Sequence, residues 1–162
     1  MTAAGDGSGA APDRPPATTT TGRPGAAGYF DYFGTAAGRR SRGYYSFNLG
    51  RWHLIALNSE CAQVGGCATG SRQERWLRAD LAAHPARCVL AYWHKPRFSS
   101  GMRGNNATYT AFWHALHGAG ADVVLVGHDH DYERFAPQTL WVPESRSWVV
   151  SCGFVGEAIR PR

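Results

Sequence analysis

Hydrophobic positions in the middle of the chain recur with the periods of strands and helices in turn. Residues 43–49 alternate apolar and polar side chains, and residues 52–57 follow after a Gly-Arg pair, so together they predict a hairpin or two adjacent strands. Residues 88–93 and 122–126 are continuous apolar runs, which is typical of strands covered on both faces. A last strand is predicted at residues 147–152.

Two amphipathic helices are predicted between these strands. The first begins at Ser71, which can form a capping box with Glu74, and it ends before Pro85. The second covers residues 108–117 and ends at a Gly-Ala-Gly sequence. Strands that alternate with helices indicate a layered α/β domain, in which chemistry lies in loops after the carboxyl ends of the strands. The side chains expected to face inward are Trp76, Leu77, Leu81 and Ala82 in the first helix, and Phe112, Trp113 and Leu116 in the second.

The 162 residues divide into parts of different composition. Residues 1–28 are mostly Gly, Ala, Pro, Thr and Ser, with too few large apolar side chains to offset the entropy cost of an ordered chain. We therefore predict a disordered leader over residues 1–28, one folded domain over residues 29–155 and a tail over residues 156–162.

The net charge of +5 comes mostly from arginines that are scattered along the chain. This balance suits a phosphate-bearing substrate, but without a basic stripe interleaved with aromatic residues it does not indicate binding to nucleic acid. The sequence has no run of 18 apolar residues, so no membrane-spanning segment is expected, and its first residues lack the pattern of a secretory signal peptide.

Four cysteines bear on the compartment in which the protein works. Cys61 and Cys67 bracket a short loop, and we predict a disulfide between them that contributes roughly 2 kcal/mol through the entropy of the unfolded chain. A disulfide is typical of exported proteins. Cys88 and Cys152 lie in apolar runs and are expected to be buried free thiols.

Two loops with histidines follow predicted strands. His94 comes directly after residues 88–93, and His128 and His130 come just after residues 122–126. In an extended segment the rings of His128 and His130 can point to one side about 7 Å apart, so each can reach a different ion of a pair lying about 3.5–4 Å apart. Imidazole nitrogen suits zinc, iron or manganese. Taken alone, His94 is more often an ordinary polar residue than a ligand, but adjacent strands would bring both loops to one edge of the sheet.

The segment from Gly127 to Arg134 resembles the closing metal motif of the purple acid phosphatases and their bacterial relatives, which are calcineurin-like metallophosphoesterases. Residues 93–96 and 98–100 resemble the preceding histidine motif of that family. The resemblance implies the C-terminal half of a four-layer α/β/β/α sandwich with mixed sheets. It runs from about residue 24 to residue 138 and includes shorter matches at residues 29–34, 44–47 and 56–59.

For function, the resemblance implies metal-dependent hydrolysis of phosphoesters by a secreted phosphatase, with a phosphorylated small molecule or another phosphoester as substrate. His94 and His128 would bind one ion of a dinuclear centre of iron, zinc or manganese, and His130 would bind the other. Asp129 and Asp131 flank the ligand histidines and are expected to orient their rings.

Arg103 stands where members of the family often place a histidine that faces the substrate. A guanidinium group can bind phosphate oxygens, but it cannot donate a proton at neutral pH, and the alternative is a solvated loop arginine. No catalytic residue is assigned, because the motif that supplies the general acid in the family is absent.

The family's first three motifs, which supply the bridging carboxylate among other ligands, are not found in the sequence. Residues 17–22 can be back-translated so that a neighbouring frame encodes Gly-Asn-His-Asp-Tyr, and we hypothesise that residues 1–23 are out of frame; the alternative is a natural leader. We therefore predict little or no activity for the chain as written. The alternative function is a catalytically inactive fragment that acts as a weak metal- or phosphate-binding module.

Overall fold

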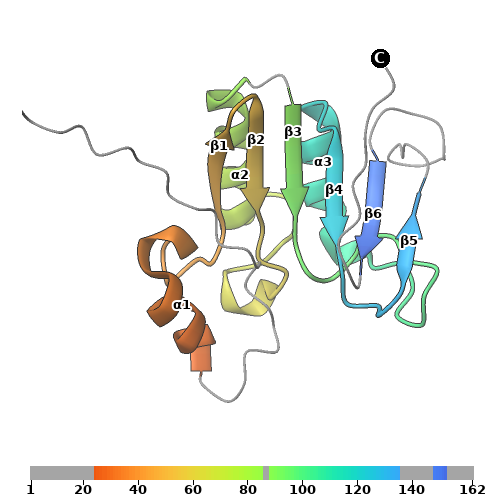
Figure 1. Cartoon of the computed structure of the whole chain (residues 1–162), viewed down its shortest axis with the longest axis horizontal. Helices are drawn as coiled ribbons and strands as arrows, with labels where there is room; N and C mark the ends of the chain where they lie inside the picture. Colours follow the sequence, from red (N-terminus) through yellow and green to blue (C-terminus); the bar gives the residue numbers. More distant parts are fainter. Residues whose placement is uncertain (1–23, 86–87, 136–147, 153–162) are drawn as a thin grey trace, which may run out of the picture.

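The computed structural model of the chain describes residues 24–85, 88–135 and 148–152, which contain one six-stranded mixed sheet. The strand order is β1-β2-β3-β4-β6-β5. Strands β2, β3, β4 and β6 run parallel, and the edge strands β1 and β5 run antiparallel to their neighbours (Figure 1). The strands are β1 (Tyr45–Leu49), β2 (Trp52–Ala56), β3 (Cys88–Tyr92), β4 (Val123–Val126), β5 (Tyr132–Arg134) and β6 (Trp148–Cys152).

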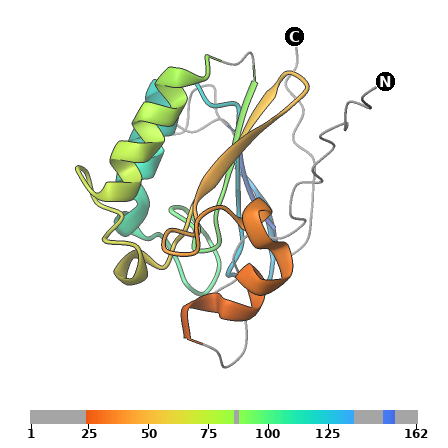
Figure 2. The ribbon, with the colours of Figure 1, turned by 90° about the vertical axis from the view of Figure 1, so that its left-hand side faces the viewer.

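Two helices, α2 (Arg72–Ala83) and α3 (Thr110–Gly118), lie together on one face of the sheet, as Figure 2 shows. A further helix, α1 (Ala27–Phe33), lies apart from this layer. As predicted, Ser71 caps α2, and its hydroxyl accepts a hydrogen bond from the Glu74 backbone N–H at 3.3 Å. None of the described helices is long and apolar enough to cross a lipid bilayer.

The core lies between this pair of helices and the sheet. It includes Leu77 from α2, Phe112 and Leu116 from α3, and Trp93 just after β3, all at most 1% exposed. Removing side chains of this size from water is the main force that holds the two layers together. The inward positions predicted for the second helix are confirmed, whereas Ala82 of the first helix is exposed.

The α/β class and the mixed sheet predicted from the sequence are confirmed, and the described residues make up one sheet with one helix layer. The prediction that residues 88–93 are covered on both faces is wrong for the described part of the chain. In β3, Val89 and Ala91 point toward the helices and are buried, whereas Cys88, Leu90 and Tyr92 on the other face are only half-buried. Cys88 is a free thiol, but it is not fully buried as expected, because it lies on that face.

Several segments differ from the prediction or fall outside the structure. Residues 24–28, assigned to the leader from the sequence, form the 3-10 turn Pro24–Ala26 and the start of α1. Residues 132–134 form the short strand β5, which the sequence pattern does not predict. Residues 1–23 and 156–162 and the side chain of Cys152 lie outside the described part of the chain, so the predictions for them stay predictions.

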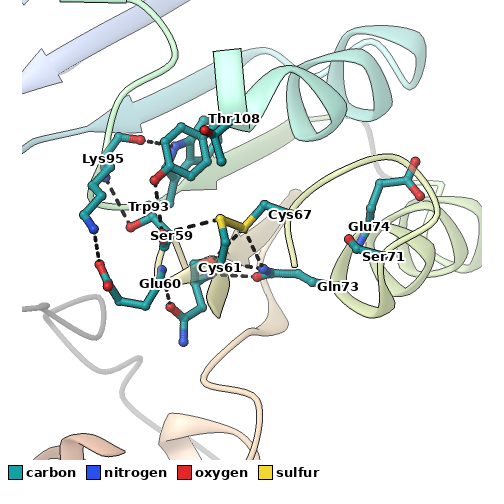
Figure 3. Close-up of a disulfide and its surroundings, with 12 residues drawn as sticks. Ser59, Glu60, Cys61, Cys67, Ser71, Gln73, Glu74, Trp93, Lys95 and Thr108 are labelled. Carbon is teal, nitrogen blue, oxygen red and sulfur yellow. Dashed lines mark hydrogen bonds and ion pairs between the residues drawn. A yellow bond between two sulfur atoms is a disulfide. The ribbon is translucent and has the colours of Figure 1, made fainter. Parts of the chain in front are cut away.

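The disulfide between Cys61 and Cys67 predicted from the sequence is present (Figure 3). It closes the loop that leads from β2 to α2, and the buried Gln73 braces the same loop. The Gln73 side chain accepts a hydrogen bond from the Asn58 backbone N–H at 2.7 Å and donates one to the Asn58 carbonyl at 2.9 Å. The next residue, Ser59, accepts a hydrogen bond from the Lys95 backbone N–H at 3.3 Å. The loop is thus tied to the residue that follows His94.

Replacing both Cys61 and Cys67 with serine is expected to lower the free energy of unfolding by about 2 kcal/mol, because the unfolded chain regains the entropy of the closed loop. Urea titration followed by circular dichroism measures the change. The matched control is Cys88→Ser, which removes a free thiol and is expected to stay within about 0.5 kcal/mol. Equal losses in the two variants would contradict the prediction.

Candidate metal centre

Backbone hydrogen bonds continue the pairing of β3 and β4 beyond the ends of both strands. The Trp93 N–H donates to the Leu125 carbonyl at 3.1 Å, and the Gly127 N–H donates to the His94 carbonyl at 2.9 Å. These bonds hold His94 beside the first residues of the loop that carries His128. The two loops therefore meet at the carboxyl edge of the parallel strands, the lower edge in Figure 1.

The rings of His94 and His128 face each other across this edge. Nε2 of His94 lies 3.1 Å from Nδ1 of His128, and the ring planes meet at 77°. Two imidazoles on one zinc ion, each at about 2.0–2.1 Å, hold their nitrogens a little over 3 Å apart. The pair therefore has a spacing that fits two ligands of a single metal ion, and in the free chain the same spacing allows a hydrogen bond between the rings.

The backbone at His128 adopts a conformation that side chains other than glycine rarely take. Its φ is 79°, which lies in the left-handed region. A residue held there costs on the order of 1–3 kcal/mol and persists only where the surrounding structure imposes it. Such residues cluster at functional sites, and here the conformation places the His128 ring against that of His94.

Burial lowers the pKa of both facing histidines below the ordinary value of 6.5. For His94, the nearby charges of His128 and Lys95 lower the pKa further, while Glu60 acts in the opposite direction. For His128, the charges of Arg103 and Lys95 add to the effect of burial. Both rings are therefore neutral at pH 7, the form in which imidazole binds a metal ion.

In the metal-free chain, the C2 protons of His94 and His128 are expected to titrate below pH 6.5 in an NMR experiment, and to return to about 6.5 in urea. Because the folded pKa values lie below the unfolded ones, the unfolded chain binds more protons in this range. The contribution to stability is therefore present above pH 6.5 and is lost as the pH falls. Midpoints at or above 6.5 in the folded chain would contradict this arrangement.

Asp129, in the loop that carries His128, forms hydrogen bonds to the loop of residues 99–103. Its carboxylate is buried, and it accepts hydrogen bonds from the Ser99 hydroxyl and, at 3.2 Å, from the Arg103 backbone N–H. A Cβ atom at Gly101 would come within 2.8 Å of Asp129 Cγ, so this approach requires glycine. The hydrogen bonds of Asp129 thus position the loop that carries Arg103. The charge of Asp129 acts against burial and partly offsets the lowering of the His128 pKa.

Glu133 reinforces the same connection from β5. It accepts hydrogen bonds from the Ser100 backbone N–H at 2.9 Å and from the Ser100 hydroxyl. His130 and Asp131 lie between Asp129 and Glu133 in the chain, and both are exposed. Their predicted roles, as a ligand of a second ion and as a residue that orients a ring, stay predictions.

Two relatives in sequence are purple acid phosphatases, although no family model matches the chain. Purple acid phosphatase 15 of Arabidopsis thaliana is 34% identical over 104 residues, which cover 60% of this chain and 19% of the relative. Purple acid phosphatase 21 of the same plant is 33% identical over 104 residues, with 58% and 22% covered. The chain is homologous to a segment of the purple acid phosphatases.

The likeness to purple acid phosphatases extends to the fold. The chain superposes on the purple acid phosphatase PPD1 of yellow lupin with a TM-score of 0.63 at 17% identity, covering 72% of this chain and 24% of the lupin protein. It also superposes on GAP50, described as the anchor in the inner membrane complex of Plasmodium, with a TM-score of 0.52 at 16% identity, covering 69% and 38%. At such identities the likeness shows the fold alone, and one fold can host different functions.

The chain spans about a fifth of the length of the Arabidopsis purple acid phosphatases that it matches. The purple acid phosphatase motifs that precede the two histidine motifs are not found in this sequence. The activity and the substrates of the whole relatives are therefore not carried over to this chain.

The resemblance to purple acid phosphatases also left one group of side chains unassigned. Among the residues that the structure describes, the one group of three or more potential ligands within 4.8 Å of one another is formed by His53, Asp80 and His84. The i, i+4 spacing of Asp80 and His84 on a predicted helix was the signal in the sequence. His53 could not be connected with them, because it lies on a strand 27 residues before Asp80.

Proposed function

We propose that the chain supplies the histidine ligands of a metal-dependent phosphoester hydrolase of the purple acid phosphatase type. The observation that carries the proposal is the 3.1 Å spacing between Nε2 of His94 and Nδ1 of His128 at the carboxyl ends of two adjacent parallel strands. In this proposal both nitrogens bind one ion, and His130, two residues after His128, binds a second ion of iron, zinc or manganese.

A bound metal pair supplies Lewis-acid chemistry at phosphorus. In this proposal Arg103 binds the substrate, and Asp129 keeps the Arg103 loop in place. Arg103 lies close enough to His128 for its charge to lower the pKa of that ring, which supports a role in binding phosphate oxygens. The bond between the Arg103 backbone and Asp129 holds that guanidinium-bearing loop against the metal ligands.

Glu60 is a carboxylate whose charge acts on both His94 and His128, and it forms an ion pair with Lys95 (Figure 3). A carboxylate engaged in this way is a poor candidate for bridging two ions. The proposal therefore keeps the expectation that the chain by itself turns over slowly or not at all. The disulfide between Cys61 and Cys67 supports placing the working protein in an oxidising, extracellular compartment.

The test measures hydrolysis of p-nitrophenyl phosphate by the chain loaded with zinc, manganese or iron. The paired variant is His128→Ala with His130→Ala, and the matched control is His114→Ala with His117→Ala, which removes two histidines from α3. Turnover, even if slow, that disappears only in the first variant supports the hydrolase. Metal uptake that the first variant loses, without any turnover in the unchanged chain, supports the alternative of a metal- or phosphate-binding module, and the absence of both rejects the metal centre.

A further inference from the structure

Three side chains converge at the edge of the sheet opposite the candidate metal centre. His53 lies near the start of β2, Asp80 lies in the last turn of α2, and His84 directly follows that helix. In Figure 1 the arrowheads of β2, β3 and β4 point away from this edge. The group is therefore separate from His94 and His128.

The atoms that could bind a cation are already close together. Nε2 of His53 lies 2.8 Å from Oδ2 of Asp80, and Nδ1 of His84 lies 3.3 Å from Oδ1 of Asp80. The two imidazole rings stack, with their centroids 4.7 Å apart. Two imidazoles and one carboxylate form a ligand set that zinc commonly takes in proteins.

Each of the two buried members is also held by a neighbour, His53 through the ring nitrogen that does not face the cluster and Asp80 through Oδ1, the same oxygen that lies 3.3 Å from His84 Nδ1. Nδ1 of His53 donates to the Asn48 side-chain oxygen at 2.8 Å, and Oδ1 of Asp80 accepts a hydrogen bond from the Ser46 hydroxyl at 2.8 Å. Such outer bonds fix the tautomer and orientation of ligands in metal sites. With the proton on Nδ1, the lone pair of His53 Nε2 faces the Asp80 carboxylate. That contact requires a cation, either a proton or a metal ion, between the two groups.

Two members of the cluster are buried, so a cation between them is needed to balance the charge, and the third member is exposed, so an ion can enter from solvent. The side chains of His53 and Asp80 are 1% and 8% exposed, so an uncompensated charge there would be costly. The side chain of His84 is 42% exposed and forms the outer wall of the cluster. Its Nδ1 also lies 2.9 Å from the Asp80 carbonyl, a hydrogen bond that metal binding would replace.

We propose that His53 Nε2, the Asp80 carboxylate and His84 Nδ1 form a binding site for one zinc ion or a similar divalent cation. The ion would join the β1–β2 hairpin to the end of α2, and its remaining coordination position would face solvent beside His84. This site is independent of the proposed hydrolase function.

The test is a zinc titration by calorimetry, with the thermal unfolding midpoint as a second readout. In a His94→Ala, His128→Ala background, we expect one bound Zn²⁺ and a midpoint that rises with zinc concentration. Adding His84→Ala, an exposed position, is expected to weaken binding by more than about tenfold and to remove the rise in midpoint. Adding His117→Ala instead is the matched control and is expected to change neither.

Asp80→Asn provides a second variant, because it keeps the shape of the side chain while removing the charge that binds the ion. Counting ions in the otherwise unchanged chain gives a measurement that does not depend on the double-alanine background. There, His84→Ala is expected to lose one equivalent of zinc. The proposal is overturned if His84→Ala binds as much zinc as His117→Ala, or if the background chain binds none.

Discussion

A chain in which alanine replaces both His94 and His128 is expected to bind at least one Zn²⁺ fewer than the unchanged chain. The two nitrogens are 3.1 Å apart and come from loops that backbone hydrogen bonds hold together, so they bind an ion with little rearrangement. Loss of both should weaken this site by more than about 100-fold, since changes to supporting residues alone cost 10–100-fold in other metal sites. Equilibrium dialysis followed by elemental analysis measures the number of ions bound.

The matched control replaces His114 and His117 with alanine on α3. It removes as many imidazoles from a face that has no assigned ligand role, and the zinc count is expected to stay the same. An equal loss in both variants would mean that zinc binds to histidines without regard to their geometry, and the account of the centre would then be wrong.

Phe112→Ala is expected to lower the free energy of unfolding by about 3–5 kcal/mol. Phe112 is fully buried where α3 meets the sheet, and its ring packs edge-on against Trp93 with the centroids 6.1 Å apart. Alanine would leave a cavity that these neighbours cannot fill without moving the residue that precedes His94. Since small domains unfold with about 5–15 kcal/mol, this is a large share of the total.

Urea denaturation measures this loss. The control is Met102→Ala, a side chain that is 99% exposed and whose removal should change the unfolding free energy by less than about 0.5 kcal/mol. A similarly small change for Phe112→Ala would show that α3 does not pack on the sheet as described.

The elements that the sequence predicted correctly are those whose signals are local. Helix α2 has its cap at Ser71 and an apolar face within 12 residues, and the β1–β2 hairpin turns within a Gly-Arg pair. The Cys61–Cys67 disulfide was predictable for the same reason, because only 6 positions separate the two residues.

The elements that sequence reasoning missed depend on distant partners. Strand β5 has three residues, and it is a strand because it pairs with β6, which follows it in the chain. The half-buried face of β3 could not be foreseen either, since an apolar run looks the same whether one face or both faces are fully covered.

The candidate sites show the same contrast. His94 and His128 each follow an apolar strand, so the rule that loops at the carboxyl ends of adjacent strands meet was enough to bring them together. No such rule linked His53 to Asp80 and His84, because their contact requires knowing how α2 lies against the hairpin.

The most direct test of the central claim, that His94 and His128 share one metal ion, is a long-range proton–nitrogen NMR experiment on the histidine rings during zinc addition. The account predicts that Nε2 of His94 and Nδ1 of His128 shift together to values typical of metal-bound nitrogen, with the same zinc dependence. A shift at only one of the two rings, or at the opposite nitrogen of either ring, would contradict it.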